Sequence, residues 1–425
     1  MVSTLFIVLL ILFVLTVPVA VSLGLASILS LWVGDRPLSL VPQYLFQGLD
    51  SFTLMAAPFF ILAGFLMQSG GISKRLINFA NALIGWARGG LASAAVLTSM
   101  FFSTMSGSSS ATTAAVGQTL IPAMEKKGYT KKFAAATVAS SGELGAILPP
   151  SLSLIMYGLV ANVSIGSLFI AGILPGIFIG ITLILTVIIW ASVKKYDNAE
   201  KLNLSEWLKS VGQTFLDSIL AFLMPFLILG GIYLGWFTPT EAAVVAVVYG
   251  FIIGFFVYRE ITIKDVGNIL ANSALISAIL LLIVGFANVF SYILTSNQMP
   301  HQLAEIIQGI SENPIVFLLL VNVLLLFIGM FMETLTSVII LGPILAPIAL
   351  QYGIDPVHFG IIMIVNLAVG MITPPIGVNL FVASEIAKIP FEQIIKPISI
   401  FLGVLIVNIL IITYLPGISL WLLPE

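Results

Sequence analysis

The chain contains 425 residues, of which 60% are apolar and 8% are charged, and its mean hydropathy is +1.17. A soluble domain carries about 25% charged residues because its surface faces water, so this composition excludes an ordinary soluble protein. The net charge of −2 excludes a broad basic surface for nucleic acid, and the absence of cysteine excludes disulfides, thiolate catalysis and cysteine-ligated metals. We therefore expect a protein embedded in a lipid bilayer, with no resident cofactor and no nucleic-acid partner.

The N-terminal segment lacks the basic start of a secretory signal. Its apolar run from Val2 to Val33 also exceeds the roughly 7–15 residues of a signal core. We interpret it as a retained, membrane-embedded segment, in which Pro18 either kinks one long helix or divides two short ones.

Apolar stretches near the length of about 20 residues that a spanning helix needs occur along the whole chain. They are residues 2–34, 50–68, 132–160, 167–193, 215–236, 240–258, 269–296, 356–383 and 398–422. These runs are too long for the alternating segments of a β-barrel, so the pattern predicts an all-α polytopic membrane protein.

Two further apolar stretches, 91–124 and 314–350, are interrupted by polar, small or proline residues and predict re-entrant helical hairpins. A short amphipathic segment precedes each of them, at 73–88 and 300–311. Lys and Arg mark the cytoplasmic side of a membrane protein, and all their clusters can lie there only if both hairpins turn back without crossing. The two hairpins then enter the membrane from opposite sides.

An internal repeat with an offset of 225 residues supports this topology. The matching glycines and prolines are Gly117 with Gly342, Pro122 with Pro347, Gly128 with Gly353, Gly145 with Gly370, and Pro149-Pro150 with Pro374-Pro375. Chance matching in a chain rich in glycine and proline is the alternative. Inverted-topology repeats are typical of secondary transporters, since two similar halves of opposite orientation can exchange conformations.

The first hairpin carries a run of hydroxyl residues around Gly107, from Ser103 to Thr113. Such residues compete for backbone hydrogen bonds and weaken a helix, and irregular backbone at membrane depth is tolerated only inside protein or beside a wet cavity. The alternative is simple packing of small residues between helices. Each double proline should likewise open its helix, because it removes two N–H donors.

These broken segments predict two sodium sites and one substrate site. Backbone carbonyls and hydroxyls suit Na⁺, and the N–H groups of the half-helix that starts after Gly107 suit a carboxylate. We expect Na⁺ near Ser103, Ser106, Gly145 and Pro149, and in the other half near Gly329, Thr336, Gly370 and Thr373. We expect the substrate between the two hairpin tips, near Ser108, Ser109, Thr112 and Asn379.

Two glutamates lie in apolar surroundings, where a carboxylate is costly and usually functional. These are Glu143, before the first double proline, and Glu333, after the predicted tip of the second hairpin. Glu333 either binds a cation, carries a proton, or caps the helix that follows. Glu241 fits a helix start, with Thr238 as N-cap and Pro239 at the first helical position.

Several blocks of this sequence resemble the large membrane subunit of TRAP (tripartite ATP-independent periplasmic) transporters. They include Ser106-Gly107-Ser108-Ser109, Leu148-Pro149-Pro150-Ser151, Ala171-Gly172-Ile173-Leu174-Pro175-Gly176 and the segment from Gly230 to Ala243. The likeness covers nearly the whole chain, and we place it near the sialic-acid branch of the family.

The resemblance implies Na⁺ coupling, an elevator motion in the bacterial inner membrane, and an organic-acid substrate such as sialic acid or a C4-dicarboxylate. It also implies two partners, a small four-helix membrane subunit on a separate chain and a periplasmic substrate-binding protein. The implied division is scaffold helices and an amphipathic arm at 1–90, transport-domain halves at 91–160 and 313–385, further scaffold helices with a second arm at 161–312, and a C-terminal scaffold helix at 386–425.

Three other functions remain as alternatives. A stand-alone divalent-anion/Na⁺ symporter would share the hairpins and repeats but need no binding protein. An ion channel would need a continuous pore, and two inverted halves in one chain argue against it. A membrane enzyme is the least compatible with the sequence, because the two histidines, His301 and His358, lie at the edges of segments rather than within a spanning core.

Overall fold

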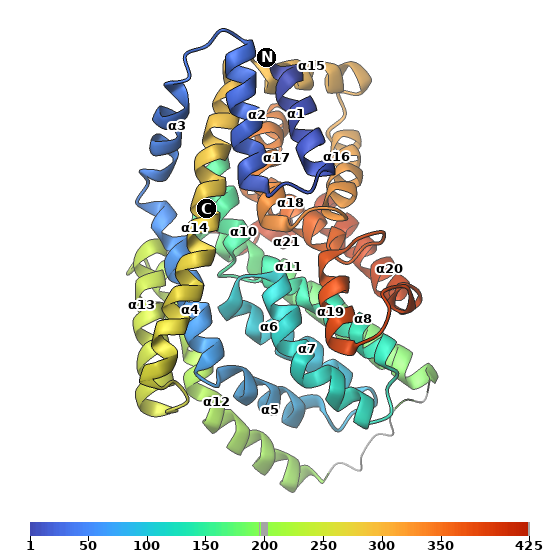
Figure 1. The fold of residues 1–425 in the computed structure, drawn as a ribbon. Coiled ribbons are helices and arrows are strands. Elements are labelled where there is room, and N and C mark those ends of the chain that lie inside the picture. Colours follow the sequence, from blue (N-terminus) through green and yellow to red (C-terminus); the bar gives the residue numbers. More distant parts are fainter. Residues whose placement is uncertain (195, 197–202, 424–425) are drawn as a thin grey trace.

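The computed structural model describes residues 1–194, 196 and 203–423, and these contain helices and no strand (Figure 1). Six of the described helices are long and apolar enough to cross a membrane, or up to nine spans if each bent pair counts as one. The expectation of an all-α polytopic membrane protein is confirmed.

The N-terminal helices differ in detail from the predicted spans. They are α1 (Val2–Val14), α2 (Val19–Val33), α3 (Leu40–Leu49), the 3₁₀ turn η1 (Thr53–Met55), α4 (Ala56–Ser69) and α5 (Ile72–Ile84). Pro18 divides two short helices, which form an antiparallel pair, because the Ser30 hydroxyl donates to the Met1 carbonyl over 2.7 Å. The sequence analysis missed α3, which bends by 67° into the following helix.

The first repeat then forms a hairpin and a broken helix. Its helices are α6 (Gly90–Ser106), α7 (Ser109–Lys126), α8 (Lys131–Gly142), α9 (Leu144–Ile147), α10 (Leu152–Ala161) and α11 (Ile165–Lys194). The chain continues through α12 (Leu204–Tyr233), α13 (Pro239–Ile252), the π-helical turn η2 (Ile253–Val257) and α14 (Ile263–Ser296). The predicted helix start at Thr238 is confirmed, since Thr238 and Glu241 form a reciprocal capping box with Pro239 between them.

The second repeat has the same order of elements. Its helices are α15 (Met299–Ile310), α16 (Pro314–Gly329), α17 (Thr334–Gln351), α18 (Pro356–Gly370), α19 (Val378–Ala387), α20 (Glu392–Tyr414) and α21 (Gly417–Leu420). The last span ends at Tyr414, eight residues before the predicted limit of 422 (422 − 414 = 8).

The offset of 225 residues aligns these elements throughout. It carries Ser109 and Lys126, the limits of α7, onto Thr334 and Gln351, which are the limits of α17 (109 + 225 = 334; 126 + 225 = 351). The amphipathic helices α5 and α15 lie at opposite ends of the molecule, and the Lys/Arg-bearing helix α5 lies at the same end as the α13–α14 turn (Figure 1). The inverted repeat is therefore present in the fold.

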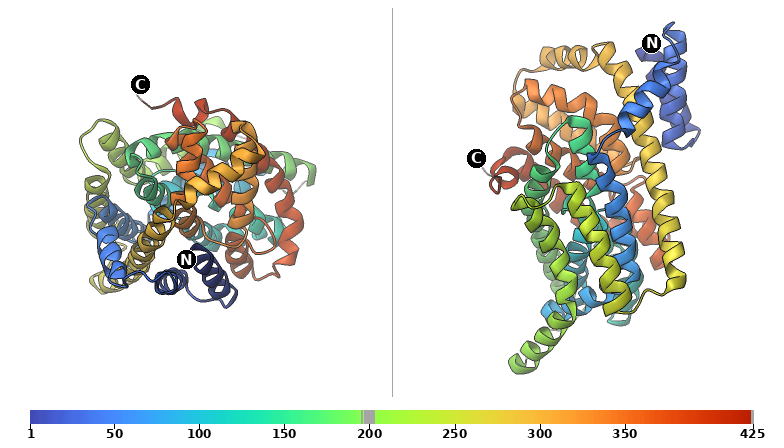
Figure 2. Two further views of the ribbon diagram at one scale, coloured as in Figure 1. Left: turned by 90° about the horizontal axis from the view of Figure 1, so that it is seen from above. Right: turned by 90° about the vertical axis from the view of Figure 1, so that its left-hand side faces the viewer.

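Each broken helix packs on the hairpin of the other half. Helix α10, which follows the first break, contacts α17, while α19, which follows the second break, contacts α7 and α8. The two hairpins and two broken helices thus form one body, which we call the transport block (Figure 2).

Helices α11 and α20 lie in the predicted scaffold segments, but both pack against the hairpins and broken helices, α11 through α6 and α18, and α20 through α8 and α18. We therefore group them by contact with the transport block, which then comprises α6–α11 and α16–α21. The division into moving and fixed parts stays a prediction. We call α1–α4 and α12–α14 the scaffold, and the arms α5 and α15 contact both bodies.

Candidate transport site

The tip of the first hairpin is a left-handed turn at Gly107, where φ is +58°. Glycine adopts this conformation without steric cost, and a Cβ here would lie 2.9 Å from the Pro150 carbonyl oxygen. The Leu152 N–H donates to the Gly107 carbonyl over 3.1 Å. The hairpin tip is therefore joined directly to the double-proline break.

The second hairpin is joined to its own break in the same way. The Gly377 N–H donates to the Met330 carbonyl over 3.0 Å, and Gly377 is the repeat counterpart of Leu152 (152 + 225 = 377). In both breaks the bond between the two prolines is cis. The two halves thus share one backbone design at the tip.

A cavity of about 200 Å³ lies where the two tips meet the scaffold, and we call it the tip cavity. The first hairpin contributes Ser106 and Ser108, and the second contributes Glu333 and Leu335. Ser108 and Glu333 are repeat counterparts (108 + 225 = 333), so the same structural position in each half faces this space. The scaffold wall consists of Ile61, Gly64, Phe65 and Gln68 of α4, and Ile276, Ile279, Leu280 and Ile283 of α14.

The predicted sodium ligands of the first half converge near this tip. A Cβ on Gly145 would lie 2.3 Å from the Ser108 carbonyl oxygen, so the broken helix touches the hairpin backbone there. The Ser106 and Thr112 hydroxyls lie 2.6 Å apart, while the Ser103 carbonyl accepts the Gly107 N–H over 3.2 Å. Pro149 precedes the Pro150 carbonyl that approaches Gly107.

The predicted ligands of the second half also gather, around a contact between two glycines. A Cβ on Gly370 would lie 2.5 Å from the Gly329 Cα, so only glycine fits at either position without a shift. The Thr373 hydroxyl donates to the Val369 carbonyl over 2.8 Å. Thr336 is buried in the first turn of α17. Sodium binding at both clusters stays a prediction.

The four predicted substrate residues separate into two groups. Ser108 lines the tip cavity, whereas Ser109, Thr112 and Asn379 are buried and do not line it. The Asn379 amide donates to the Ser109 hydroxyl over 2.8 Å, and that hydroxyl donates to the Gly142 carbonyl over 3.3 Å. These bonds tie α19 to the first hairpin behind its tip, so Ser108 is the member of this set that faces free space.

The two glutamates also have different places. Glu333 exposes its side chain to the tip cavity and makes no side-chain capping bond to α17 among the described residues, so the capping alternative is excluded. Glu143 is fully buried, and neither of its carboxylate oxygens has a hydrogen-bond partner in the described part of the chain. Glu143 is not among the described residues that line the tip cavity.

One buried hydrogen bond in each half was not foreseen from the sequence. Ser99 of α6 and Ser141 of α8 join their hydroxyls over 2.9 Å. In the second half the Asn366 amide of α18 donates to Asn322 of α16 over 2.9 Å. Ser141 and Asn366 are repeat counterparts (141 + 225 = 366), and each lies one helical turn before the glycine of its break. The repeat offset would have revealed this pair.

Comparisons with known proteins give a consistent result. The family model of the tripartite ATP-independent periplasmic transporter, DctM component, matches residues 6–418. The chain is 44% identical to the isethionate TRAP transporter permease protein DctMQ of Oleidesulfovibrio alaskensis, over 96% of this chain and 64% of that protein. This chain thus spans slightly under two thirds of that relative's length.

Two shorter relatives match over most of both chains. The C4-dicarboxylate TRAP transporter large permease protein DctM of Pseudomonas aeruginosa is 43% identical, over 94% of this chain and 93% of its own. The sialic acid TRAP transporter large permease protein SiaM of Vibrio cholerae is 40% identical, over 90% of this chain and 88% of its own. The crystal structure of the YdaH transporter of Alcanivorax borkumensis has the same fold, with a TM-score of 0.64 at 18% identity over 91% of this chain and 89% of that one.

Proposed function

Because this chain belongs to the family of DctM components of TRAP transporters, we propose that it is the large transmembrane subunit of a Na⁺-coupled importer of an organic acid. The observation that carries the proposal is the tip cavity, where both hairpins face one space beside the scaffold. A secondary transporter needs such a space near the boundary between its inverted halves. Transport, rather than catalysis, is the activity for which the relatives are named.

The substrate that we propose is an organic acid of the sialic-acid or C4-dicarboxylate class. Its carboxylate would lie at Ser108, the N-cap of α7, whose hydroxyl accepts the Ala111 N–H, and beside the remaining N–H groups of the first turn. Glu333 is the only charged residue among those lining the tip cavity. Anion binding there therefore depends on helix N–H groups and on bound cations rather than on a basic side chain.

Sodium would supply that positive charge at the two clusters around Gly145 and Gly370. Both clusters adjoin a hairpin tip through backbone contacts, so bound Na⁺ would order the tip that binds the substrate. Ion and substrate then each raise the affinity for the other, since coupling free energies are reciprocal.

The proposed motion is an elevator, in which the transport block slides past the scaffold and the arms α5 and α15 bend. Extensive packing within the transport block supports movement as one body. The proposed setting is the bacterial inner membrane, with a small four-helix membrane subunit beside the scaffold and a periplasmic binding protein that delivers the substrate. The periplasmic side would be the end that holds α15 (Figure 1).

A reconstitution experiment tests these proposals against the stand-alone symporter. Proteoliposomes would hold this chain with or without its small membrane subunit, and labelled sialic acid, succinate and isethionate would be offered with and without the cognate binding protein. We expect uptake of at least one acid only with all three components and inward Na⁺. Strong uptake by this chain alone would favour the stand-alone symporter instead.

A further inference from the structure

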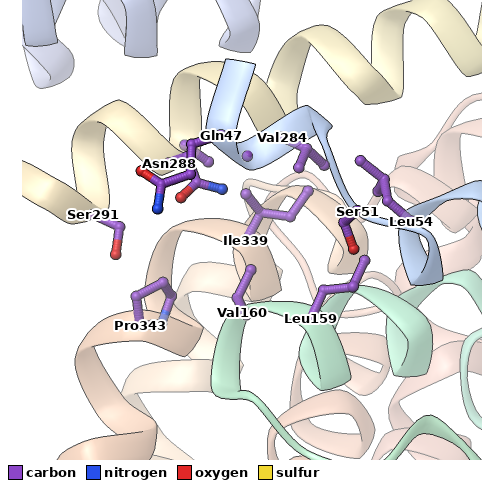
Figure 3. Close-up of a pocket in the computed structure, with 12 residues that line it drawn as sticks. Gln47, Ser51, Leu54, Leu159, Val160, Val284, Asn288, Ser291, Ile339 and Pro343 are labelled. Carbon is purple, nitrogen blue, oxygen red and sulfur yellow. The ribbon is translucent and has the colours of Figure 1, made fainter. Parts of the chain in front are cut away.

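A second cavity, of about 210 Å³, lies further toward the α15 end of the molecule, and we call it the outer cavity (Figure 3). Its scaffold wall carries Gln47 and Ser51 near the end of α3, and Asn288 and Ser291 of α14. Leu159, Val160, Ile339 and Pro343 of the transport block form the facing wall, as Figure 3 shows. Like the tip cavity, it therefore lies between the scaffold and the transport block.

The two cavities follow one another along the same helices. On α14 the tip cavity is lined by residues 276, 279, 280 and 283, and the outer cavity by residues 284, 287, 288 and 291. Each outer-cavity position lies eight residues after a tip-cavity position, which corresponds to a rise of ~12 Å along an α-helix. On α17 the same step leads from Leu335 to Pro343.

The scaffold walls of the two cavities differ in chemistry. The scaffold wall of the tip cavity has one polar side chain, Gln68, beside four aliphatic residues of α14. The scaffold wall of the outer cavity has two amides and two hydroxyls, beside Leu54, Val284 and Ala287. Within the described residues neither amide makes a hydrogen bond to another residue. The amide of Asn288 lies against α3 at Gly48, where a Cβ would come within 2.3 Å of its nitrogen.

The scaffold wall of the outer cavity is held together as one surface. Tyr44 of α3 and Tyr292 of α14 stack with their ring centres 3.9 Å apart and their planes at 20°. Gln47 lies three residues after Tyr44 and Asn288 lies four residues before Tyr292, so each is about one helical turn from the stacked rings and a shift of the transport block would leave their relative position unchanged.

The repeat independently relates the two walls. Ile276 and Ile279 of the tip cavity have Ser51 and Leu54 as repeat counterparts, and both of these line the outer cavity (276 − 225 = 51; 279 − 225 = 54). In an inverted-repeat transporter, one half in one state takes the role of the other half in the opposite state. In the opposite state, the hairpin tips should therefore lie beside residues of the outer cavity instead of Ile276 and Ile279.

From these observations we propose that Gln47, Asn288 and Ser291 form the scaffold wall of the substrate site when the transport block has moved outward. The substrate would then meet two amides and a hydroxyl on the outer side, and mainly apolar side chains with the single amide of Gln68 on the inner side. Its polar groups would bind more tightly before inward movement than after it, which favours release inside. This inference rests on the proposed function, because it requires a block that carries the substrate along the scaffold.

A cross-linking series tests the displacement without knowledge of the substrate. The chain has no cysteine, so pairs can be introduced without prior substitutions. Leu335→Cys would be combined with Asn272→Cys, Leu280→Cys or Asn288→Cys, three α14 positions spaced by eight residues. We expect Hg²⁺ to bridge Cys at 335 with Cys at 280 or at 288, but not with Cys at 272. The ratio of the two bridged products should change when Na⁺ is added.

A transport assay tests the chemistry of the wall. Asn288→Leu and Gln47→Met should raise the half-saturation constant for uptake from outside by ~10-fold, the loss of about one hydrogen bond. The half-saturation constant for efflux from preloaded vesicles should change by less than ~2-fold, which is no more than the effect of an ordinary surface substitution. Asn272→Leu, which removes an exposed amide from the same helix, is the matched control and should alter neither constant.

The outcomes separate this inference from the proposed function. Absence of Na⁺-dependent uptake by the wild-type complex would reject the proposed function itself. Wild-type uptake without a bridge between positions 335 and 288 would reject the proposed displacement and, with it, the outer wall. Wild-type uptake with the bridge, but with unchanged outside half-saturation in Asn288→Leu and Gln47→Met, would reject the polar outer wall alone. The cross-links also decide the case if a wall variant fails to fold.

Discussion

In the first half of the transport block, the hairpin tip carries Ser108 and the position before the break carries Glu143. In the second half, the same positions carry Glu333 and Ala368 (108 + 225 = 333; 143 + 225 = 368). A neutral residue in one half thus corresponds to an acidic residue in the other at both places. The two halves have the same backbone path, but each carries its acidic side chain, Glu143 or Glu333, at a different point along that path.

The features that do not differ between the halves are those of the backbone. Gly145 and Gly370 both allow a hairpin to touch the broken helix, and the N–H groups of Leu152 and Gly377 both bond to a hairpin carbonyl. Steric contact of this kind permits no side chain, whereas the side chains that line a cavity can change with the ligand. The comparison indicates that the backbone contacts proposed to bind Na⁺ are shared, whereas the side chains that line the tip cavity differ between the halves.

The largest effect should come from breaking a shared glycine contact. Gly370→Val places a branched side chain where a Cβ alone would be 2.5 Å from the Gly329 Cα, so the hairpin must move. We expect Na⁺-dependent uptake to fall by more than ~100-fold, consistent with strain of about 3 kcal/mol at an overpacked contact. Gly230→Val is the control, because nothing lies within 4 Å of a Cβ at that position. Normal sodium dependence in Gly370→Val would refute the second cation site.

A smaller effect should come from Ser108, the tip residue that we propose faces the substrate. Ser108→Ala should raise the half-saturation constant of uptake at saturating Na⁺ by ~10- to 150-fold, the cost of about 1.5–3 kcal/mol for a charge-assisted hydrogen bond. Ser109→Ala and Thr112→Ala should leave this constant nearer to that of the wild type, since both hydroxyls are buried behind the tip. A set of wild-type curves from all three well-folded variants would place the carboxylate elsewhere.

The sequence was sufficient to predict the features that depend on backbone chemistry. Glycine at positions 107, 145 and 370 and the two double prolines mark their turns and breaks through properties of the residue itself. The transport-block wall at Ser108 could also be predicted, because a run of hydroxyl residues weakens a helix and irregular backbone at membrane depth lies inside protein or beside a wet cavity.

The parts that could not be predicted depend on packing between distant segments. Lipid-facing and protein-facing apolar helices look alike in sequence, so α11 and α20 were assigned to the scaffold although they contact the transport block. For the same reason the sequence does not reveal that Ile276 and Asn288 line cavities, since this depends on which face of α14 is turned toward the transport block. Burial of Ser109 and Asn379 likewise followed from a contact between residues that are 270 positions apart.

Side-chain hydrogen bonds within the block should give moderate effects on stability, and the second half should be the more sensitive. The Asn366 amide donates both to Asn322 and to the Ile362 carbonyl, and all three groups are buried. Asn366→Ala removes both bonds and leaves a space, which should lower the free energy of unfolding by about 2–3 kcal/mol. Titration of the purified protein with SDS in mixed micelles measures this loss. A loss below ~0.5 kcal/mol would show that the two hydrogen bonds of the Asn366 amide contribute little to the stability of the protein.

The equivalent bond in the first half should contribute least. Ser141→Ala removes one neutral hydroxyl bond to Ser99, and a single such bond is worth about 1 kcal/mol. Serine to alanine also leaves almost no space, so no cavity cost adds to the loss as it does at Asn366. A double-mutant cycle with Ser99→Ala isolates the bond, because the Ser141 hydroxyl also lies 3.3 Å from the Val138 carbonyl and a single substitution would disturb that contact too. We expect a coupling energy of about 0.5–1 kcal/mol in the same SDS titration. If Ser141→Ala instead cost as much as Asn366→Ala, the two halves would depend equally on side-chain bonds, and the asymmetry inferred here would be limited to the cavity walls.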